Sequence, residues 1–176
     1  KAIYKIITLT LALSLWSCSE KIMDEINTNV NDPTEMASRL IITDAITNTA
    51  FSVTGGDFNF YASIYIEHNV GVFGQFYNAE IRSSEPTSSG TYNNAWNTVY
   101  QNLYNLKVII EKCSTGGTEE GNWHTLGIAQ ILSAYNLSLV TDVMGDVPWS
   151  EAIQPDVIFT PVLDNHSAIY ASIISR

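Results

Sequence analysis

The sequence predicts an all-α fold built from pairs of helices. Apolar residues recur at spacings of three and four over several long segments, which is the period of a helix with one buried face. Stretches containing glycine and proline separate these segments, and no run alternates polar and apolar residues as a half-buried strand would. With 176 residues the chain is long enough for one domain with a core.

The first predicted helix opens at residues 31–35, which read Asn-Asp-Pro-Thr-Glu. The aspartate can cap the helix, the proline suits its first position, and the glutamate completes a capping box. We expect this helix to run to about Phe51, with Met36 and Leu40 facing inward. A second helix, rich in aromatic residues, is predicted over residues 58–72.

Residues 73–92 contain Gly74, Pro86 and Gly90 and predict a long loop. A loop of that length inside a compact domain is usually functional or disordered.

The next helix has the clearest pattern, and its inward face is Trp96, Val99, Tyr100, Leu103, Leu106, Ile110 and Cys113. A glycine-containing break at residues 114–117 leads to a fourth helix that starts at about Asn122 and ends at Gly145 and Pro148. The inward residues of the fourth helix are Leu126, Ala129, Leu132, Val140 and Val143. Two such helices pack antiparallel, like one repeat of a helical solenoid.

A last helix is predicted to start near Asp164, and its pattern stops at Arg176. Because the chain also begins without methionine, we expect it to be a fragment of a longer protein.

The N-terminus has the pattern of a secretory signal. Residues 1–17 combine lysines, a short apolar run and a final serine, and Cys18 follows directly. The apolar run is too short to span a bilayer. The junction resembles the lipobox of bacterial lipoproteins, in which the cysteine is acylated, although Trp16 is bulkier than usual there. The alternative is an ordinary signal with an incidental cysteine. Residues 18–30 then form a tether, and residues 31–176 the helical domain.

Charge and cysteine content restrict the function. The formal net charge of −10 repels phosphate backbones and argues against nucleic acid as a partner. It argues equally against electrostatic adhesion to an anionic membrane, so the lipid on Cys18 would have to anchor the protein. That use of Cys18 leaves Cys113 unpaired, and we expect it to be a small core residue.

Residues 141–152 carry the most specific motif, Thr-Asp-Val-Met-Gly-Asp-Val-Pro-Trp-Ser-Glu-Ala. Physically it is a helix stop, because Gly145 accepts a left-handed conformation and Pro148 forbids further helix. Asp146 and Glu151 can accept backbone N–H groups in the turn and at the next helix start. The motif closely resembles the helix end of the SusD/RagB family, in the branch with Gly-Asp-Val-Pro-aromatic-Ser-Glu-Ala.

Other segments resemble the family in the same order: Cys18 behind a signal, residues 31–33, Trp96 to Ile110 with Asn102 and Asn105, and residues 159–170. One departure is Ser133, where many members have an arginine. The resemblance implies a longer surface lipoprotein of Bacteroidota with tetratricopeptide-like helix pairs. Such proteins sit on TonB-dependent, SusC-like outer-membrane barrels and capture glycans or peptides for import.

The residues offer little for catalysis. His68, His124 and His166 have no spacing typical of a zinc site, so we expect no metal, no cofactor and no enzymatic activity. Asp142, with Asp146 and Glu151, could be imagined as a glycosidase pair, but capping is the preferred interpretation.

Binding has better candidates. Sugars stack their C–H faces on aromatic rings and hydrogen-bond to amide side chains. That mixture occurs in the segment where family members often place ligand residues, at Phe73, Gln75, Phe76, Tyr77, Asn78, Tyr92, Asn93 and Asn94. Of these, Phe76, Tyr77, Tyr92 and Asn93 are the proposed ligand residues. The alternative is that these aromatics pack the loop onto the helices, and Trp96 is assigned to the core by its helical phase.

These observations favour an outer-membrane, surface-exposed lipoprotein that binds a glycan or peptide and works with a SusC-like transporter. Two rivals remain open: a helical-repeat scaffold that binds proteins, and a lipid-anchored hydrolase.

Overall fold

The computed structural model describes residues 36–83, 91–154 and 157–175. The predicted signal peptide, Cys18, the tether and the helix opening at residues 31–35 lie outside the described residues. The described elements are α3 (Ser38–Asn48), the π-helix η1 (Thr49–Thr54), α4 (Asp57–Tyr65), α5 (Gly74–Glu80), α6 (Asn93–Cys113), α7 (Trp123–Met144) and α8 (His166–Ile174). The only extended pairing within the described residues is an isolated antiparallel bridge between Val147 and Asp164, which lie between α7 and α8. The all-α prediction is confirmed.

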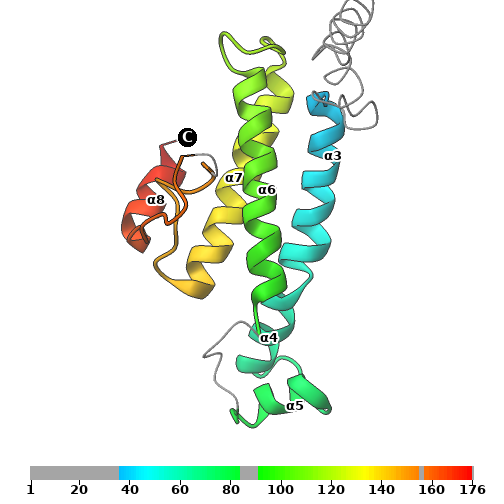
Figure 1. Ribbon diagram of the computed structural model, residues 1–176. Coiled ribbons are helices and arrows are strands. Elements are labelled where there is room, and N and C mark those ends of the chain that lie inside the picture. The colour runs from blue at the N-terminus through cyan, green and yellow to red at the C-terminus, as the bar shows by residue number, and fades with distance from the viewer. Residues whose placement is uncertain (1–35, 84–90, 155–156, 176) are drawn as a thin grey trace, which may run out of the picture. The chain divides into compact units, whose positions relative to one another are not determined.

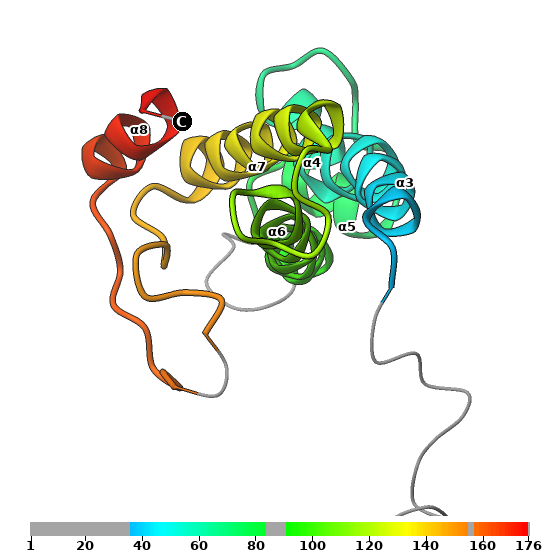
Figure 2. The same ribbon diagram turned by 90° about the horizontal axis from the view of Figure 1, so that it is seen from above.

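The centre of the fold is the antiparallel pair α6 and α7, with α3 packed against both (Figures 1 and 2). Helix α8 packs on α7, whereas α4 and α5 lie at the end where α6 begins (Figure 1). Two helices joined by residues 114–122 therefore form the scaffold, as the sequence predicted.

The core of the described residues has two clusters along the α6–α7 pair and a third, smaller one between α4 and α5. The first is built on Val99, Leu103, Leu137, Val140 and Ile169, and the second on Ala45, Leu106, Ile109, Cys113 and Ala129. Each large aliphatic side chain among them contributes roughly 1.5–3 kcal/mol through burial. Cys113 is fully buried, which confirms it as a core residue. Trp96 is partly buried against the first cluster.

Helix α7 is apolar enough, by length and composition, to satisfy the criterion for a membrane span. It packs against α6, α3, η1 and α8, which accounts for apolar residues on several of its faces. Val143, predicted to face inward, is 37% exposed because it lies in the last turn before Gly145.

Three buried polar residues join the central helices. Asn102 Nδ2 on α6 donates to Thr49 Oγ1 at 2.8 Å, to Ala45 O at 3.2 Å and to Asn136 Oδ1 at 3.3 Å. Asn136 Nδ2 on α7 donates to Thr49 Oγ1 at 2.9 Å. Thr49 begins the π-helix, so the place where α3 gives way to η1 is tied to both scaffold helices. The network fixes the register of these elements.

The first two helices differ from their prediction. Met36 and Ala37 are not helical and α3 starts at Ser38; Met36 and Leu40 are 44% and 50% exposed. The run Leu40-Ile41-Ile42 left the helical phase ambiguous, and Ile41 and Ile42 pack on the core with Ala45 instead.

The second helix, α4, ends at Tyr65 rather than Val72, because backbone N–H groups of His68 and Asn69 turn back to Ser63 O and Glu67 takes a positive φ of 61°. The predicted loop over residues 73–92 contains the seven-residue helix α5. Helix α5 has little sequence signal, because packing of Phe76 and Ala79 stabilises it rather than a long apolar period.

Candidate functional site

Aromatic rings gather where α4, α5 and the start of α6 meet. Tyr61 is buried, and its ring centre lies 5.7 Å from that of Phe76 and 5.4 Å from that of Tyr92. Phe60 also contacts Phe76 at 5.8 Å, and Phe58 contacts Tyr92 at 5.7 Å. We call this region the α4–α5 end.

The structure brings two of the four predicted ligand residues together. Phe76 and Tyr92 both pack on Tyr61, so each has a structural role. Tyr77, on α5, is 48% exposed. Asn93, directly after Tyr92 in the chain, is the exposed first residue of α6.

The Tyr92 hydroxyl stays protonated at neutral pH. Burial, together with the nearby Tyr65, Tyr61 and Asp57, raises the pKa of Tyr92 to about 12. A hydroxyl in that state can both donate and accept a hydrogen bond.

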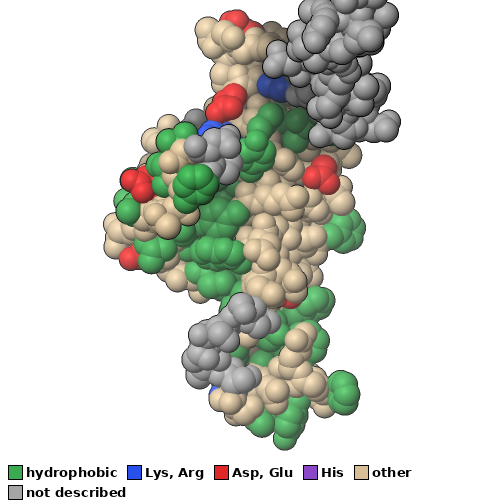
Figure 3. Space-filling view, in the orientation of Figure 1, with side chains coloured by type: hydrophobic (Ala, Val, Ile, Leu, Met, Phe, Trp, Pro, Cys, Tyr) green, Lys and Arg blue, Asp and Glu red, His purple; other side chains and the backbone are tan. Residues whose placement is uncertain are grey.

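A hollow of about 390 Å³ opens beside this cluster, and we call it the aromatic hollow. Its lining is Phe60, Ser63, Ile64, Asn69, Val70, Val72, Phe73 and Phe76. Phe73 is 85% exposed and Phe60 49% exposed, so ring faces are presented to solvent. Hydrophobic side chains are visible at this end of the molecule (Figure 3). Asn69 Nδ2 donates to Ser63 Oγ at 3.0 Å and supplies the polar part of the wall.

Residues 66–74 shape the hollow by a close backbone approach. A Cβ on Gly71 would lie 1.9 Å from Phe76 O, so only glycine fits there. Gly71 N donates to Glu80 Oε2 at 3.1 Å, and Gly74 enters α5 with a φ of 57°. Phe60, Val70 and Val72 were not predicted as site residues, whereas Phe73 belongs to the aromatic segment that the sequence singled out. The signal that could have found Val70 and Val72 is the apolar Val-Gly-Val-Phe run at the end of the predicted second helix.

The residues of the helix-stop motif lie elsewhere, between α7 and α8. Gly145 has φ 82° and ψ −124°, a region open to glycine but outside the left-handed helical well. Asp146 Oδ1 accepts the His166 N–H at 2.9 Å, at the first residue of α8. Glu151 Oε2 accepts the Val162 N–H at 3.1 Å. Pro148 O accepts the Tyr100 hydroxyl at 2.8 Å, which ties the turn to α6.

Asp164 organises the other side of this turn. Its Oδ2 accepts the N–H groups of Trp149 and Ser150 at 2.8 Å and 2.7 Å, and its Oδ1 accepts the Ser150 hydroxyl at 2.7 Å. Partial burial acts to raise the pKa of Asp164, but the hydrogen bonds from Ser150 and Trp149 outweigh it and lower that pKa.

The described residues contain no group of three or more His, Cys, Asp or Glu side chains arranged to hold a metal ion. His166 Nε2 lies 3.6 Å from Asp142 Oδ1, and the Tyr170 hydroxyl donates to the same oxygen at 2.6 Å. These contacts join α8 to the end of α7.

Comparison with known proteins identifies the family. Residues 30–176 match the SusD-like family described as "Starch-binding associating with outer membrane". The fold is similar to the crystal structure, at 1.75 Å, of a SusD/RagB family protein from Bacteroides thetaiotaomicron VPI-5482, with 48% sequence identity and a TM-score of 0.74. That match covers 80% of this chain and 29% of the other, so the chain spans less than a third of that relative's length. No curated protein matches the chain. The chain belongs to the SusD/RagB family, a family of binding proteins associated with the outer membrane.

Proposed function

We propose that this chain is part of a surface lipoprotein that binds glycan or peptide nutrients and delivers them to a TonB-dependent, SusC-like transporter without catalysing a reaction. The observation that carries the proposal is the aromatic hollow. It exposes Phe60 and Phe73 in the region where the sequence predicted ligand residues, in a chain of a family described as starch-binding. Exposed apolar patches of this kind mark interaction sites.

The hollow has the chemistry that a sugar or an aromatic peptide side chain needs. The faces of Phe60 and Phe73 offer stacking surfaces, and Tyr77 extends the exposed aromatic surface on α5. An amide has two N–H donors and an acceptor oxygen, so Asn69 retains hydrogen-bonding capacity beyond its bond to Ser63. The ligand therefore binds by stacking, with few but directional polar contacts.

Delivery to a transporter requires the protein to stay at the membrane, and Cys18 would carry the lipid. We expect Cys18→Ala in the full-length protein to leave the fold intact but to move the protein from the membrane fraction to the soluble fraction. Cys113→Ala, which removes the buried thiol, is the matched control and should stay in the membrane fraction. Retention of Cys18→Ala in the membranes would contradict the anchoring proposal.

The transporter partnership is tested by affinity purification of the tagged, full-length lipoprotein from outer membranes in mild detergent. We expect recovery of a large TonB-dependent barrel, and recovery of the lipoprotein alone would contradict the import role. Glycans and peptides are then screened against the purified complex to identify the ligand.

A second candidate function, a scaffold that binds other proteins, is favoured by one surface. Trp123, Ile131 and Tyr135 on α7 are 58%, 70% and 42% exposed and lie at four- and eight-residue spacings on one helix face. Recovery of water-soluble proteins without a barrel in the same purification would favour this scaffold role.

A further inference from the structure

We propose that α6 and residues 149–154 form a second carbohydrate-binding groove, with two neighbouring positions for neutral pyranose rings of an oligosaccharide. This inference rests on the proposed function, because it takes the nutrient to be a glycan. It adds a site apart from the aromatic hollow, lined by different residues.

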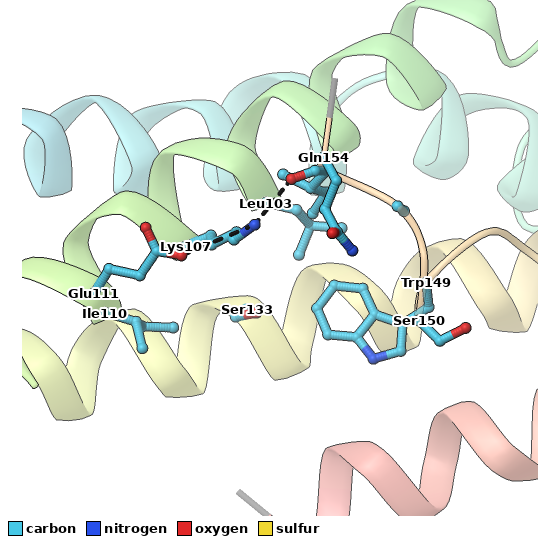
Figure 4. A pocket seen from close by; sticks show the side chains of 10 residues that line it. Leu103, Lys107, Ile110, Glu111, Ser133, Trp149, Ser150 and Gln154 are labelled. Carbon is cyan, nitrogen blue, oxygen red and sulfur yellow. Dashed lines mark hydrogen bonds and ion pairs between the residues drawn. The ribbon is translucent and has the colours of Figure 1, made fainter. Parts of the chain in front are cut away.

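The groove consists of two hollows, of about 390 Å³ and about 300 Å³. Both are lined by Lys107 and Glu111 on α6 and by Ile153 and Gln154 on the loop. The larger hollow has Trp149 as a wall, as Figure 4 shows, and the smaller one has Tyr104. Two hollows that share these four residues, one lined by Trp149 and the other by Tyr104, suit two consecutive sugar units.

The Trp149 wall is held in place before any ligand arrives. Trp149 Nε1 donates to Ser172 Oγ at 3.1 Å, and its backbone N–H donates to Asp164 Oδ2 at 2.8 Å. The Trp149 ring lines the larger hollow together with apolar Leu103 and Ala152. Tyr104 is 47% exposed on the outer face of α6. A ring already fixed by other contacts loses little conformational entropy when a sugar stacks on it.

The polar residues that the two hollows share suit a neutral ligand. Lys107 Nζ donates to Ile153 O at 3.0 Å and lies 3.8 Å from Glu111 Oε1, so the two charges compensate each other (Figure 4). The Lys107 ammonium offers N–H donors and the Glu111 carboxylate offers acceptors. The Gln154 amide offers both donors and an acceptor. Sugar hydroxyls need donors and acceptors side by side.

Surrounding contacts hold the loop over α6 in a strained backbone conformation at Ile153. Ile153 has a φ of 62°, a conformation that is unfavourable for a β-branched residue. The Ala152 N–H donates to Trp149 O at 3.1 Å, and the Ile153 carbonyl receives the Lys107 ammonium. Strain of this kind persists only where surrounding contacts impose it, and it occurs frequently at ligand sites.

The test uses the full-length protein without its lipid (Cys18→Ala), labelled with 5-fluorotryptophan and observed by 19F NMR. The probes are a panel of neutral methyl pyranosides and their disaccharides, with tripeptides as a second panel. We expect at least one disaccharide to shift the Trp149 signal and to leave the signal of Trp123, an exposed residue on α7, unchanged. Tyr104→Ala should weaken that binding about tenfold, because one stacking face is lost.

Two matched controls distinguish the groove from general effects. Phe51→Ala removes an aromatic ring that is 76% exposed on η1 and should leave the affinity unchanged. Gln154→Ala should weaken binding severalfold, whereas Gln101→Ala, on the exposed surface of α6, should not.

The outcomes separate this inference from the proposed function. If calorimetry detects a glycan while the Trp149 signal stays fixed and Tyr104→Ala binds normally, the groove is wrong and the proposed function stands. If the Trp149 signal responds only to peptides, the carbohydrate groove is also wrong. If Tyr104→Ala weakens binding and Phe73→Ala does not, the groove stands and the aromatic hollow is wrong. If no glycan binds, the groove proposal falls.

Discussion

The α6–α7 scaffold and the α4–α5 end use the same kinds of side chain in opposite ways. In the scaffold, Asn102 and Asn136 are fully buried and bond to each other and to Thr49. At the α4–α5 end, Asn69 is exposed, and Phe73 keeps most of its ring in solvent. Residue type alone therefore does not distinguish a structural position from a binding position, whereas burial and hydrogen bonding do.

The largest effects on stability should come from the two core clusters, which contain Leu106 and Phe58. Leu106→Ala removes a side chain that is fully buried beside Ile109 and Ala129. We expect a loss of about 2–5 kcal/mol in the free energy of unfolding, from lost burial plus the remaining cavity. Denaturant titration followed by circular dichroism measures it. Leu40→Ala, at a half-exposed position on α3, is the control and should cost much less.

The next effect concerns the buried polar network. Asn102→Ala removes the hydrogen bonds that Asn102 Nδ2 donates to Ala45 O and to Thr49 Oγ1. We expect a loss of about 2 kcal/mol in unfolding free energy, because these groups are buried. Asn105→Ala, one turn away with only a 3.5 Å contact to Asp44, should cost under about 0.5 kcal/mol. Equal costs for the two variants would contradict a special role for the network.

The contribution of the Asp164 carboxylate to the free energy of unfolding should depend on pH. Its folded-state pKa is lowered, so its contribution to stability is fully present above its unfolded pKa and is lost as pH falls through the folded value. We expect Asp164→Ala to cost about 1 kcal/mol at pH 7, a figure reduced for partial solvent exposure. The difference between wild type and variant should shrink below about pH 4. A difference that stays constant down to pH 2 would show that the carboxylate charge is not involved.

The smallest effect on stability is predicted for Phe73, the most exposed ring of the α4–α5 end. Phe73→Ala should change the free energy of unfolding by less than about 0.5 kcal/mol, since the ring is 85% exposed. Phe58→Ala, which removes a ring that is only 4% exposed on the neighbouring helix α4, should cost about 3–5 kcal/mol. Thermal unfolding of the two variants compares them directly, and similar losses would mean that Phe73 is part of the core.

The sequence predicted the scaffold better than the ends. Helices α6 and α7 are long and strongly periodic, with stop residues such as Gly145, so their extent followed from local pattern. Helix α5 was missed because it depends on contacts of Phe76 with Tyr61, fifteen residues earlier. The turn at Glu67, which ends α4 early, contains neither glycine nor proline.

The candidate sites were predicted only in part. The aromatic segment that contains Phe73 and Phe76 was found, but the hollow that these rings line with Phe60 depends on the turn at Gly71, which local pattern does not reveal. The groove on α6 brings Lys107 next to Ile153, which is 46 residues later, through a strained backbone with no sequence signal. The hollow and the groove both depend on contacts between residues far apart in the chain, and local sequence patterns do not predict such contacts.

The claim that the α4–α5 end receives the ligand is tested most directly by calorimetric titration of the ligand found in the screen. The wild type, Phe73→Ala and the matched control Phe51→Ala are compared, since both rings are exposed and only Phe73 lines the aromatic hollow. We predict that Phe73→Ala weakens the affinity about tenfold or more while Phe51→Ala leaves it unchanged. Equal affinities for wild type and Phe73→Ala would contradict the assignment of ligand binding to the α4–α5 end.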